Sequence, residues 1–317
     1  MRIVRNLESV TYNKNRIITV GTFDGVHLGH KEIFRVMKER AKEIGAEFTV
    51  VSFDPHPRLF LQPDSGLKLL TTLKEKSALL ESLGVDLFIV LKFDRELSQN
   101  DSETFLKEYL LDKIGFSEIA VGYDHRFGKG RDGDGETIRK FAREHSLASH
   151  TIEAVEYDET KVSSSRIREL LLEGDVKTAA KLLGRYYSFE GTVVKGLQRG
   201  RQLGFPTANV NPSEELKQLA RNGVYAVCVE FDGITLNGVM NSGTRPTFDD
   251  KTEVFHEIHL FEFSGDIYGK ELQVAVIEQI RDEKKFNGMN ELIAQITADA
   301  DTAKSILRKI QKPFVYF

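Results

Sequence analysis

The ten residues GTFDGVHLGH (21–30) follow a short β-branched run, RIITV (16–20), and precede a stretch with helical spacing, KEIFRVMKERAKEIG (31–45). The glycines of this segment permit a tight turn and a close approach of the backbone to a ligand. His27 and His30 are three positions apart at the predicted helix start, so both side chains can point the same way. The N–H groups of a helix N-terminus attract anions. The segment therefore predicts a polyphosphate site between a strand and a helix.

Strand and helix signals alternate through the first half of the chain. Strands are predicted at 47–53, 85–93 and 118–123, and helices at 71–84, 102–115 and 136–146. Nearly continuous apolar strands that alternate with helices indicate a parallel sheet covered on both faces. Ligands of such sheets bind beyond the carboxyl ends of the strands. The segment 163–184 is predicted to form one or two helices that close this Rossmann-like α/β domain.

The pattern changes after residue 186 to short strands and turns. Asp232 and Gly233 separate two strand-like runs, which is a strong hairpin signal. This pattern predicts an antiparallel barrel or sandwich. A last helix is predicted at 289–310. We therefore expect two domains, 1–184 and 185–317.

Composition narrows the class of protein. The chain has 317 residues, of which 40% are hydrophobic and 29% charged, which is typical of a globular protein. Its single cysteine, Cys228, excludes an internal disulfide, and its place in an apolar run predicts a buried structural thiol. Neither a membrane span nor a signal peptide is recognisable, so we expect a cytoplasmic protein with no membrane partner. The net charge of -4 gives no broad attraction for nucleic acid, and nothing in the sequence assigns an oligomeric state.

A second glycine-rich segment, VVKGLQRGRQLGFPTANVN (193–211), contains three basic residues. Such a loop either cradles phosphates through its N–H groups and cations or is a solvated turn. Thr207 and Asn209 are two positions apart and so lie on one side of an extended segment. Their hydroxyl and amide oxygens suit Mg²⁺, which prefers few protein ligands together with nucleotide phosphates.

The first motif resembles that of the HxGH nucleotidyltransferases, and with the preceding FDG it is most similar to the FAD synthetase branch. This resemblance implies that His27 and His30 bind ATP phosphates and stabilise transfer of the adenylyl group. A further segment, SSSRIR (163–168), resembles the phosphate motif of that family, although it would also suit a serine helix cap. The implied ATP contacts in this domain are Gly21, Phe23, Asp24, Gly29, Ser164, Ser165 and Arg168.

Two loops after predicted strands resemble the flavin side of the same family. They are FDPHP (53–57) and GYDHRFGKGRDGD (122–134). The resemblance implies flavin contacts by Pro55, His56, Asp124 and Phe127. For His56 and Asp124 the alternative is the capping of a turn. The family has an aromatic residue at the position of His125, so the chain departs from the pattern there.

The second half resembles the riboflavin kinases, which are six-stranded barrels. The similar segments are PTAN (206–209), NSGTRPTF (241–248), HEIHLFEFSGDIYGK (256–270) and IRDEKKF (280–286). The resemblance implies that Glu257 is the catalytic base, whereas strand alternation alone would make it an outward-facing residue. The implied ATP contacts are Lys195, Gly196, Arg201, Gly204, Pro206, Thr207 and Asn209, with Thr207 and Asn209 as Mg²⁺ ligands. Arg281, with Tyr268 and Phe286, is expected beside the flavin.

Together the two motif sets resemble prokaryotic bifunctional riboflavin kinase/FMN adenylyltransferases over essentially the whole chain. This resemblance implies riboflavin, FMN, FAD and ATP as ligands and Mg²⁺ as cofactor. One alternative is a nucleotidyltransferase whose barrel only binds flavin or regulates. Another is a nucleic-acid-binding protein, because class I aminoacyl-tRNA synthetases share an HxGH-type signature. The sequence has no second synthetase signature, and its net charge argues against nucleic acid.

Overall fold

Residues 1–196, 200, 204–246, 252–310 and 313–314 are described by the computed structural model. They form two compact units, of which the first runs from Met1 to Ser164 and the second begins at Ser165. The helices α7 (Ser164–Glu173) and α8 (Val176–Leu183), predicted to close the first domain, are grouped with the second unit apart from Ser164. Among the described residues, no helix combines the length and the apolar character that crossing a bilayer requires.

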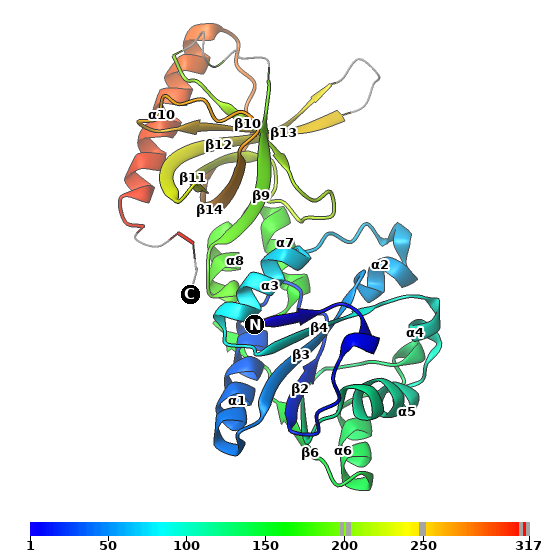
Figure 1. The fold of residues 1–317 in the computed structure, drawn as a ribbon. Helices are drawn as coiled ribbons and strands as arrows, with labels where there is room; N and C mark the ends of the chain where they lie inside the picture. The colour runs from blue at the N-terminus through cyan, green and yellow to red at the C-terminus, as the bar shows by residue number, and fades with distance from the viewer. Residues whose placement is uncertain (197–199, 201–203, 247–251, 311–312, 315–317) are drawn as a thin grey trace. The chain divides into compact units, whose positions relative to one another are not determined.

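A six-stranded parallel sheet lies at the centre of the first unit, as the alternating pattern predicts (Figure 1). Its order is β1-β4-β3-β2-β5-β6. The strands are β1 (Arg2–Val4), β2 (Arg16–Val20), β3 (Glu47–Asp54), β4 (Leu87–Lys92), β5 (Glu118–Gly122) and β6 (Ala148–Ile152). Because β2 lies between β3 and β5, the connections diverge beside it. The carboxyl end of such a strand is the usual ligand site of an open parallel sheet.

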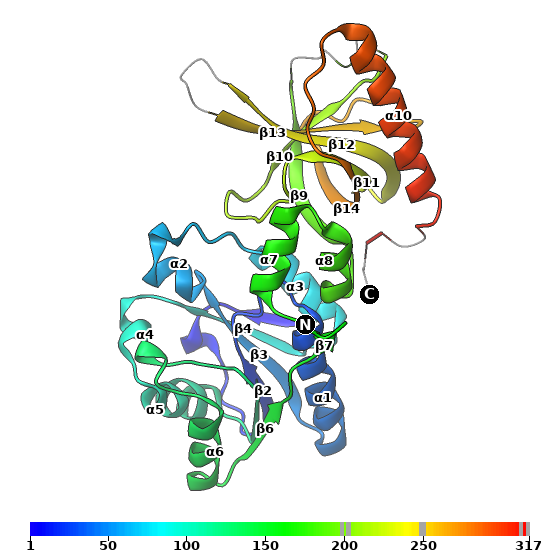
Figure 2. The ribbon, with the colours of Figure 1, turned by 180° about the vertical axis from the view of Figure 1, so that it is seen from behind.

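Helices cover both faces of this sheet (Figure 2). On one face, α1 (Leu28–Ile44) and α3 (Leu73–Ser82) bury apolar side chains such as Phe34 and Leu80 in one cluster with the strands. On the other face, α4 (Arg95–Gln99), the π-helix η3 (Phe105–Ile114) and α6 (Gly135–Glu144) contribute to a second cluster. Burial on both sides explains why the central strands β2, β3, β4 and β5 are mostly apolar and buried rather than alternating, whereas the edge strand β6 (ASHTI) has no buried residue.

Short elements complete the first unit. They are α2 (Pro57–Leu61), α5 (Ser102–Thr104), the hairpin of β7 (Glu156–Tyr157) and β8 (Thr160–Lys161), and the 3-10 turns η1 (Leu7–Ser9), η2 (Pro63–Ser65) and η4 (Lys129–Arg131). The longer helices begin and end at capping residues. Thr72 and Glu75 form a capping box at the start of α3, and Gly45 ends α1 with a φ of 65°. The helix α1 begins three residues before the predicted position because the last residues of the motif form its first turn.

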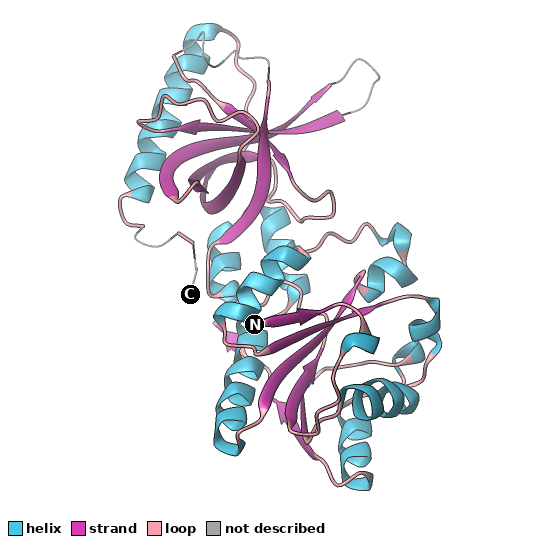
Figure 3. Cartoon of the chain, viewed as in Figure 1, coloured by secondary structure: helices cyan, strands magenta, loops and turns pink. Residues whose placement is uncertain are grey.

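The second unit contains a closed six-stranded barrel, one of the two architectures that the strand pattern predicts (Figure 3). Its order is β10-β13-β12-β11-β14-β9, with β9 paired to β10 and all neighbours antiparallel. The strands are β9 (Tyr187–Val194), β10 (Ala208–Pro212), β11 (Gly223–Phe231), β12 (Ile234–Pro246), β13 (Thr252–Leu260) and β14 (Glu271–Arg281). Asp232 and Gly233 both have positive φ values, 49° and 75°, as the predicted two-residue hairpin turn requires.

The helix α10 (Met289–Leu307) covers one outer face of the barrel (Figure 3). Its Ala300 and Ala303 belong to an apolar cluster with Cys228 of β11 and Ile277 of β14. Residues that alternate with these along β11, such as Tyr225, are also fully buried, as expected for the interior of a small barrel. The predicted burial of Cys228 is confirmed, and this burial raises the pKa of its thiol to about 11.

Candidate active sites

The loop at residues 21–27, called the motif loop below, joins β2 to α1 with several residues in unfavourable backbone conformations. Phe23, Gly25 and Val26 have positive φ values of 46°, 86° and 42°. Glycine adopts such values without cost, but a β-branched valine does so only where the surrounding structure enforces it. Val26 is fully buried and Phe23 nearly so, and their packing supplies part of that enforcement. Backbone strain of this kind is concentrated at functional sites.

His27 and His30 lie face to face at the start of α1. Their ring centroids are 3.6 Å apart at an interplanar angle of 18°, and the edge-on ring of Phe23 lies 5.2 Å from His30. His27 is the N-cap residue of the helix. A Cβ added at Gly29 would lie 3.2 Å from the Cε1 atom of His27, so this glycine leaves room for the ring. The predicted pair of imidazoles therefore shares one helix N-terminus at the carboxyl end of β2.

Asp24 and Ser164 hold the motif loop in place. The buried Asp24 carboxylate accepts hydrogen bonds from the backbone N–H groups of Leu70, at 3.1 Å, and Thr71, at 3.0 Å. The N–H group of Gly25 donates to the Thr71 hydroxyl at 3.0 Å. The Ser164 hydroxyl donates to the carbonyl oxygen of Asp24 at 2.9 Å. Both side chains are thus occupied within the protein, and their contact with ATP stays a prediction.

The remaining residues of the SSSRIR segment lie on α7. Ser165 and Arg168 are in the first two turns of this helix, which is described with the second unit. The helix turns one apolar side inward, where Ile167 and Leu171 are fully buried. The phosphate contacts expected of Ser165 and Arg168 stay predictions.

The FDPHP loop leads from β3 into the short helix α2. The Nδ1 atom of His56 accepts a hydrogen bond from the N–H group of Arg58 at 3.1 Å, so His56 caps α2. This is the turn-capping role that the sequence left open for it. Pro55 lies just before this cap, and the exposed Phe60 lies on the helix itself. The loop therefore carries an aromatic side chain that sequence reasoning did not single out.

A row of aromatic rings connects the two predicted flavin loops. Neighbouring centroids in this aromatic row are 5.5 to 6.1 Å apart. In order its members are Phe60, Phe93, Phe53, Phe105, Phe127 and His125. Phe53 lies in β3, and Phe93 directly follows β4, so the row crosses the carboxyl ends of adjacent strands. Phe127, predicted to contact the flavin, is largely buried within this row. Most of the row belongs to the apolar core on this side of the sheet, and Phe60 is its exposed end.

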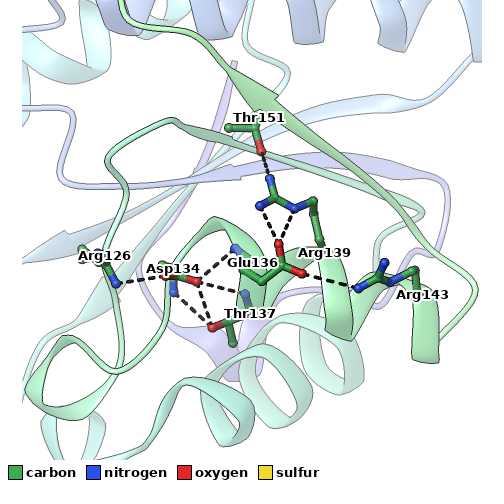
Figure 4. A network of polar contacts seen from close by, with 7 residues as sticks. All are labelled: Arg126, Asp134, Glu136, Thr137, Arg139, Arg143 and Thr151. Atoms are coloured by element: carbon green, nitrogen blue, oxygen red, sulfur yellow. Dashed lines mark hydrogen bonds and ion pairs between the residues drawn. The ribbon is translucent and has the colours of Figure 1, made fainter.

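The second flavin loop is tied to α6 and β6 (Figure 4). Asp134 caps α6 by accepting hydrogen bonds from the N–H groups of Glu136 and Thr137, and it pairs with Arg126 at 3.0 Å. Arg139 connects the same helix to β6 by donating to the Thr151 hydroxyl at 3.3 Å, and Glu136 of its own helix accepts a further hydrogen bond from it. Phe127 and Gly133 form a backbone bridge that closes the loop. These contacts fix the loop that presents the exposed Asp124.

His125 ends this aromatic row as a neutral ring. Its ring stacks on Phe127 with centroids 5.5 Å apart at 21°. Desolvation lowers the pKa of His125 to about 4, although the Asp124 carboxylate opposes the shift. The imidazole is therefore uncharged near neutral pH and offers a flat aromatic face. Although His125 differs from the residue typical of the family, its imidazole still provides an aromatic ring at this position.

The kinase motifs meet on the outer face of the barrel. In the antiparallel pair of β10 and β13, Asn209 lies directly opposite Glu257. On the other side of β13, Asn241 of β12 lies directly opposite Glu257. Opposite residues of an antiparallel pair share a face of the sheet, with Cβ atoms about 5 Å apart. The register therefore forms a polar row of Asn209, Glu257 and Asn241, the last of which sequence reasoning missed.

The PTAN segment is held against β13 by His259. The Nδ1–H group of His259 donates to the carbonyl oxygen of Pro206 at 2.8 Å, and the ring of Phe205 meets His259 edge-on at 5.5 Å. Strand alternation correctly predicts that Glu257 and His259 lie on one face, with His256 and Ile258 buried on the other.

Two glycines of the glycine-rich segment 193–211, called the basic loop below, pack closely on the predicted metal ligands. A Cβ added at Gly196 would collide with the amide group of Asn209. A Cβ added at Gly200 would lie 3.2 Å from the hydroxyl oxygen of Thr207 and would collide with the backbone. Lys195 is exposed at the end of β9, and Gly204 has a φ of 83°. Arg199 and the predicted ATP ligand Arg201 lie outside the described residues.

Arg281 is held by α10. Its guanidinium makes a bidentate ion pair with the buried Asp299, at 2.7 to 3.1 Å, and lies 5.7 Å from the ring centroid of Phe286. Gln295 donates a further hydrogen bond to Asp299 at 2.9 Å. The guanidinium therefore joins β14 to α10 in the structure, and its predicted flavin contact stays a prediction.

Comparisons with known proteins match both halves of the chain. Residues 9–166 match the family model of FAD synthetases, and residues 183–307 match that of riboflavin kinases. The chain is 34% identical to the bifunctional riboflavin kinase/FMN adenylyltransferase of Haemophilus influenzae, over 96% of this chain and 99% of that protein. It is 35% identical to the Bacillus subtilis protein of the same name, over 93% of this chain and 94% of that protein.

A solved structure agrees over the same length. It is described as that of a macrolide-efflux protein from Streptococcus pneumoniae, and it superposes with a TM-score of 0.87 at 29% identity. The match covers 98% of this chain and 99% of that one. With two family models and full-length relatives in agreement, the chain belongs to the family of bifunctional riboflavin kinase/FMN adenylyltransferases.

Proposed function

We propose that the protein phosphorylates riboflavin to FMN with ATP and then transfers an adenylyl group from ATP to FMN, giving FAD and pyrophosphate. The observation that carries this proposal is the presence of two separate polar sites on one chain. One is the stacked pair His27 and His30, and the other is the cross-strand pair Asn209 and Glu257. We place the boundary between the two catalytic domains at residues 184–185 of the chain. A cytoplasmic location stays a prediction.

In the adenylyl transfer, a phosphate oxygen of FMN attacks the α-phosphorus of ATP and pyrophosphate leaves. The FMN phosphate is already ionised at neutral pH, so this step needs no strong base. His27, His30 and the N–H groups at the start of α1 would donate hydrogen bonds to the oxygens on which negative charge accumulates. Preorganised donors of this kind stabilise the transition state more than the ground state.

The aromatic row would bind the isoalloxazine ring of FMN, and Phe60 is its most exposed phenylalanine, at 39%. We expect Phe60→Ala to raise the KM for FMN about 5- to 10-fold with a small change in kcat, because one ring contact is lost. Steady-state FMN adenylylation measures this, with Leu61→Ala, on the same helix and more exposed, as the control. An unchanged KM for FMN in folded Phe60→Ala would contradict the assignment.

In the kinase reaction, Glu257 would accept the proton of the ribityl 5′-hydroxyl as that oxygen attacks the γ-phosphorus of ATP. The hydroxyl oxygen forms a bond to phosphorus, and ADP leaves. Asn209 and Asn241 flank the base and would orient the reacting groups. The cations of the basic loop, Lys195 among the described residues, would offset charge on the phosphates.

Thr207 and Asn209 fit a magnesium site that is completed by nucleotide oxygens. Among the described parts of the chain, no group of three or more histidine, cysteine, aspartate or glutamate side chains is placed to hold a metal. A site made of two neutral oxygens therefore depends on the phosphates of the nucleotide, as Mg²⁺ commonly does. When bound, Mg²⁺ would neutralise charge on the β- and γ-phosphates. The close fit of Gly196 against the Asn209 amide keeps this ligand in place.

We expect Gly196→Ala to lower kcat/KM for riboflavin phosphorylation at least about 10-fold, because the added methyl group displaces the Asn209 amide. FMN adenylylation by the same variant should be unchanged. The matched control is Gly288→Ala, where an added Cβ meets open space. Normal kinase activity in Gly196→Ala would mean that the position of Asn209 does not matter for the reaction.

The direct test of the proposed function is chromatography of the flavins formed from riboflavin, ATP and Mg²⁺, with FMN replacing riboflavin in a parallel reaction. The proposal predicts FAD in both reactions, with FMN as an intermediate in the first. FAD from supplied FMN alone would leave the barrel as a binding or regulatory module. No flavin turnover in either reaction would contradict the proposal.

A further inference from the structure

A buried lysine lies beneath the motif loop, although neither motif includes it. Lys76 is on the first turn of α3 and is only 7% exposed. Its Nζ atom donates to the carbonyl oxygen of Thr22 at 2.7 Å and lies 3.4 Å from the hydroxyl oxygen of Ser52. The Ser52 hydroxyl donates to the same Thr22 carbonyl at 3.2 Å. Two side chains from different elements therefore meet at one backbone oxygen of the loop.

The contact of Lys76 belongs to a larger attachment between the loop and the start of α3. The residues just before this helix, Leu70 and Thr71, hold Asp24 and Gly25 through the hydrogen bonds described above. Lys76 adds the fixation of Thr22, at the residue where the chain leaves the sheet and turns toward the left-handed Phe23. A loop with strained residues keeps its shape only if neighbouring groups over-determine it.

The lysine is retained in spite of an electrostatic cost. Desolvation lowers the pKa of Lys76, and the carboxylates of Asp24, in the loop, and Asp54, at the end of β3, oppose the shift. A buried ammonium is expensive unless it is paired or hydrogen-bonded, so a residue that only filled space here would more simply be apolar. The hydrogen bond to Thr22, at 2.7 Å, is the shorter of the two contacts that the Nζ atom makes beneath the loop.

We propose that Lys76 is a positioning residue for the adenylyl transfer. By holding the Thr22 carbonyl, it fixes the path of the strained loop and so the placement of His27 and His30 at the helix start. The inference rests on the proposed role of that histidine pair. Lys76 lies on a different helix from the two histidines and would act on them through the Thr22 carbonyl.

The test compares Lys76→Met, which keeps the length and removes the charge, with Lys74→Met, an exposed lysine of the same helix. We expect Lys76→Met to lower kcat for FMN adenylylation by about 10- to 100-fold, because small displacements of catalytic groups have effects of this size. The KM for FMN should change little, since the aromatic row is untouched. Riboflavin phosphorylation by the same chain should be unchanged, and so should both activities of Lys74→Met.

A readout independent of activity separates this inference from the proposed function. In NMR spectra of the imidazole groups, the resonances of His27 and His30, assigned with His27→Gln and His30→Gln, should move in Lys76→Met and stay in place in Lys74→Met. Shifted resonances would support the positioning role even if the wild-type protein had no adenylyltransferase activity. Unchanged resonances and unchanged kcat in folded Lys76→Met would overturn the inference.

If Lys76→Met does not fold, Ser52→Ala tests the same attachment. It removes the other donor to the Thr22 carbonyl with a small loss of volume. We expect a smaller decrease in kcat for FMN adenylylation and a movement of the same two histidine resonances. No effect on either measurement would contradict a role for the fixed Thr22 carbonyl.

Discussion

His30→Ala is expected to stop FAD formation while riboflavin is still converted to FMN, which then accumulates. The imidazole lies in the stacked pair at the start of α1, where it would stabilise negative charge around the α-phosphorus of the transferring adenylyl group. Loss of one such preorganised donor typically lowers the rate about 10²- to 10³-fold. Chromatography of FMN and FAD over time, starting from riboflavin and ATP, measures both steps in one experiment.

The matched control for this variant is His145→Ala. His145 is an exposed histidine at the end of α6, and its ring contacts Phe141 rather than the motif loop. It should retain both activities. If folded His30→Ala still formed FAD at the wild-type rate, the assignment of the adenylyl-transfer site to the stacked pair would be wrong.

Glu257→Gln should have the opposite effect, with riboflavin left unphosphorylated and supplied FMN still converted to FAD. The glutamine keeps the shape of the side chain between Asn209 and Asn241 but cannot accept a proton at neutral pH. General-base catalysis contributes about 10²- to 10⁴-fold, and we expect a loss of this size. The initial rate of FMN formation from riboflavin measures it.

Glu271→Gln is the control for Glu257→Gln, because it makes the same chemical change at an exposed position on another strand of the barrel. Its two activities should match those of the wild-type protein. A folded Glu257→Gln variant with normal riboflavin phosphorylation would exclude this glutamate as the base and would leave only an orienting role for the polar row.

The long helices and strands could be predicted because each has its own signal within the segment itself. The apolar run of β4 identifies a buried strand, and the capping residues of α3 mark where that helix begins. The strand β10 was missed because ANVNP (208–212) is short and polar, and it is a strand only through its neighbours in the closed barrel. Both edge strands of the parallel sheet were also missed, because β1 has only three residues and β6 (ASHTI) is polar and partly exposed.

The site residues also differ in whether they could be predicted, according to whether their contact is local in the sequence or depends on the fold. The pairing of His27 with His30 follows from three-residue spacing within one helix, so the sequence was sufficient to predict it. The position of Asn241 beside Glu257 depends on the register of two strands, which hydrogen bonding across the barrel sets. The spacing of residues along the chain has no information about that register, and so Asn241 was not found.

Buried polar contacts were also beyond prediction from the sequence. Lys76 appears in an amphipathic helical pattern where lysine would ordinarily face solvent, yet it is buried beneath the motif loop. The ion pair of Arg281 with Asp299, which lies 18 residues further along the chain, was not predicted, and the flavin contact expected of Arg281 stays a prediction. Both outcomes depend on which carboxylate or carbonyl group the fold brings within reach, and only the three-dimensional structure shows this.

The two catalytic sites of this chain are proposed to work independently, and a mixing experiment tests this most directly. His30→Ala and Glu257→Gln are each incubated with riboflavin, ATP and Mg²⁺, alone and as an equimolar mixture, and FAD is measured by chromatography. If the sites are independent, we expect almost no FAD from either variant alone and FAD from the mixture, because FMN made by the first variant is adenylylated by the second. A mixture of folded variants that forms no FAD would contradict the independence of the two sites.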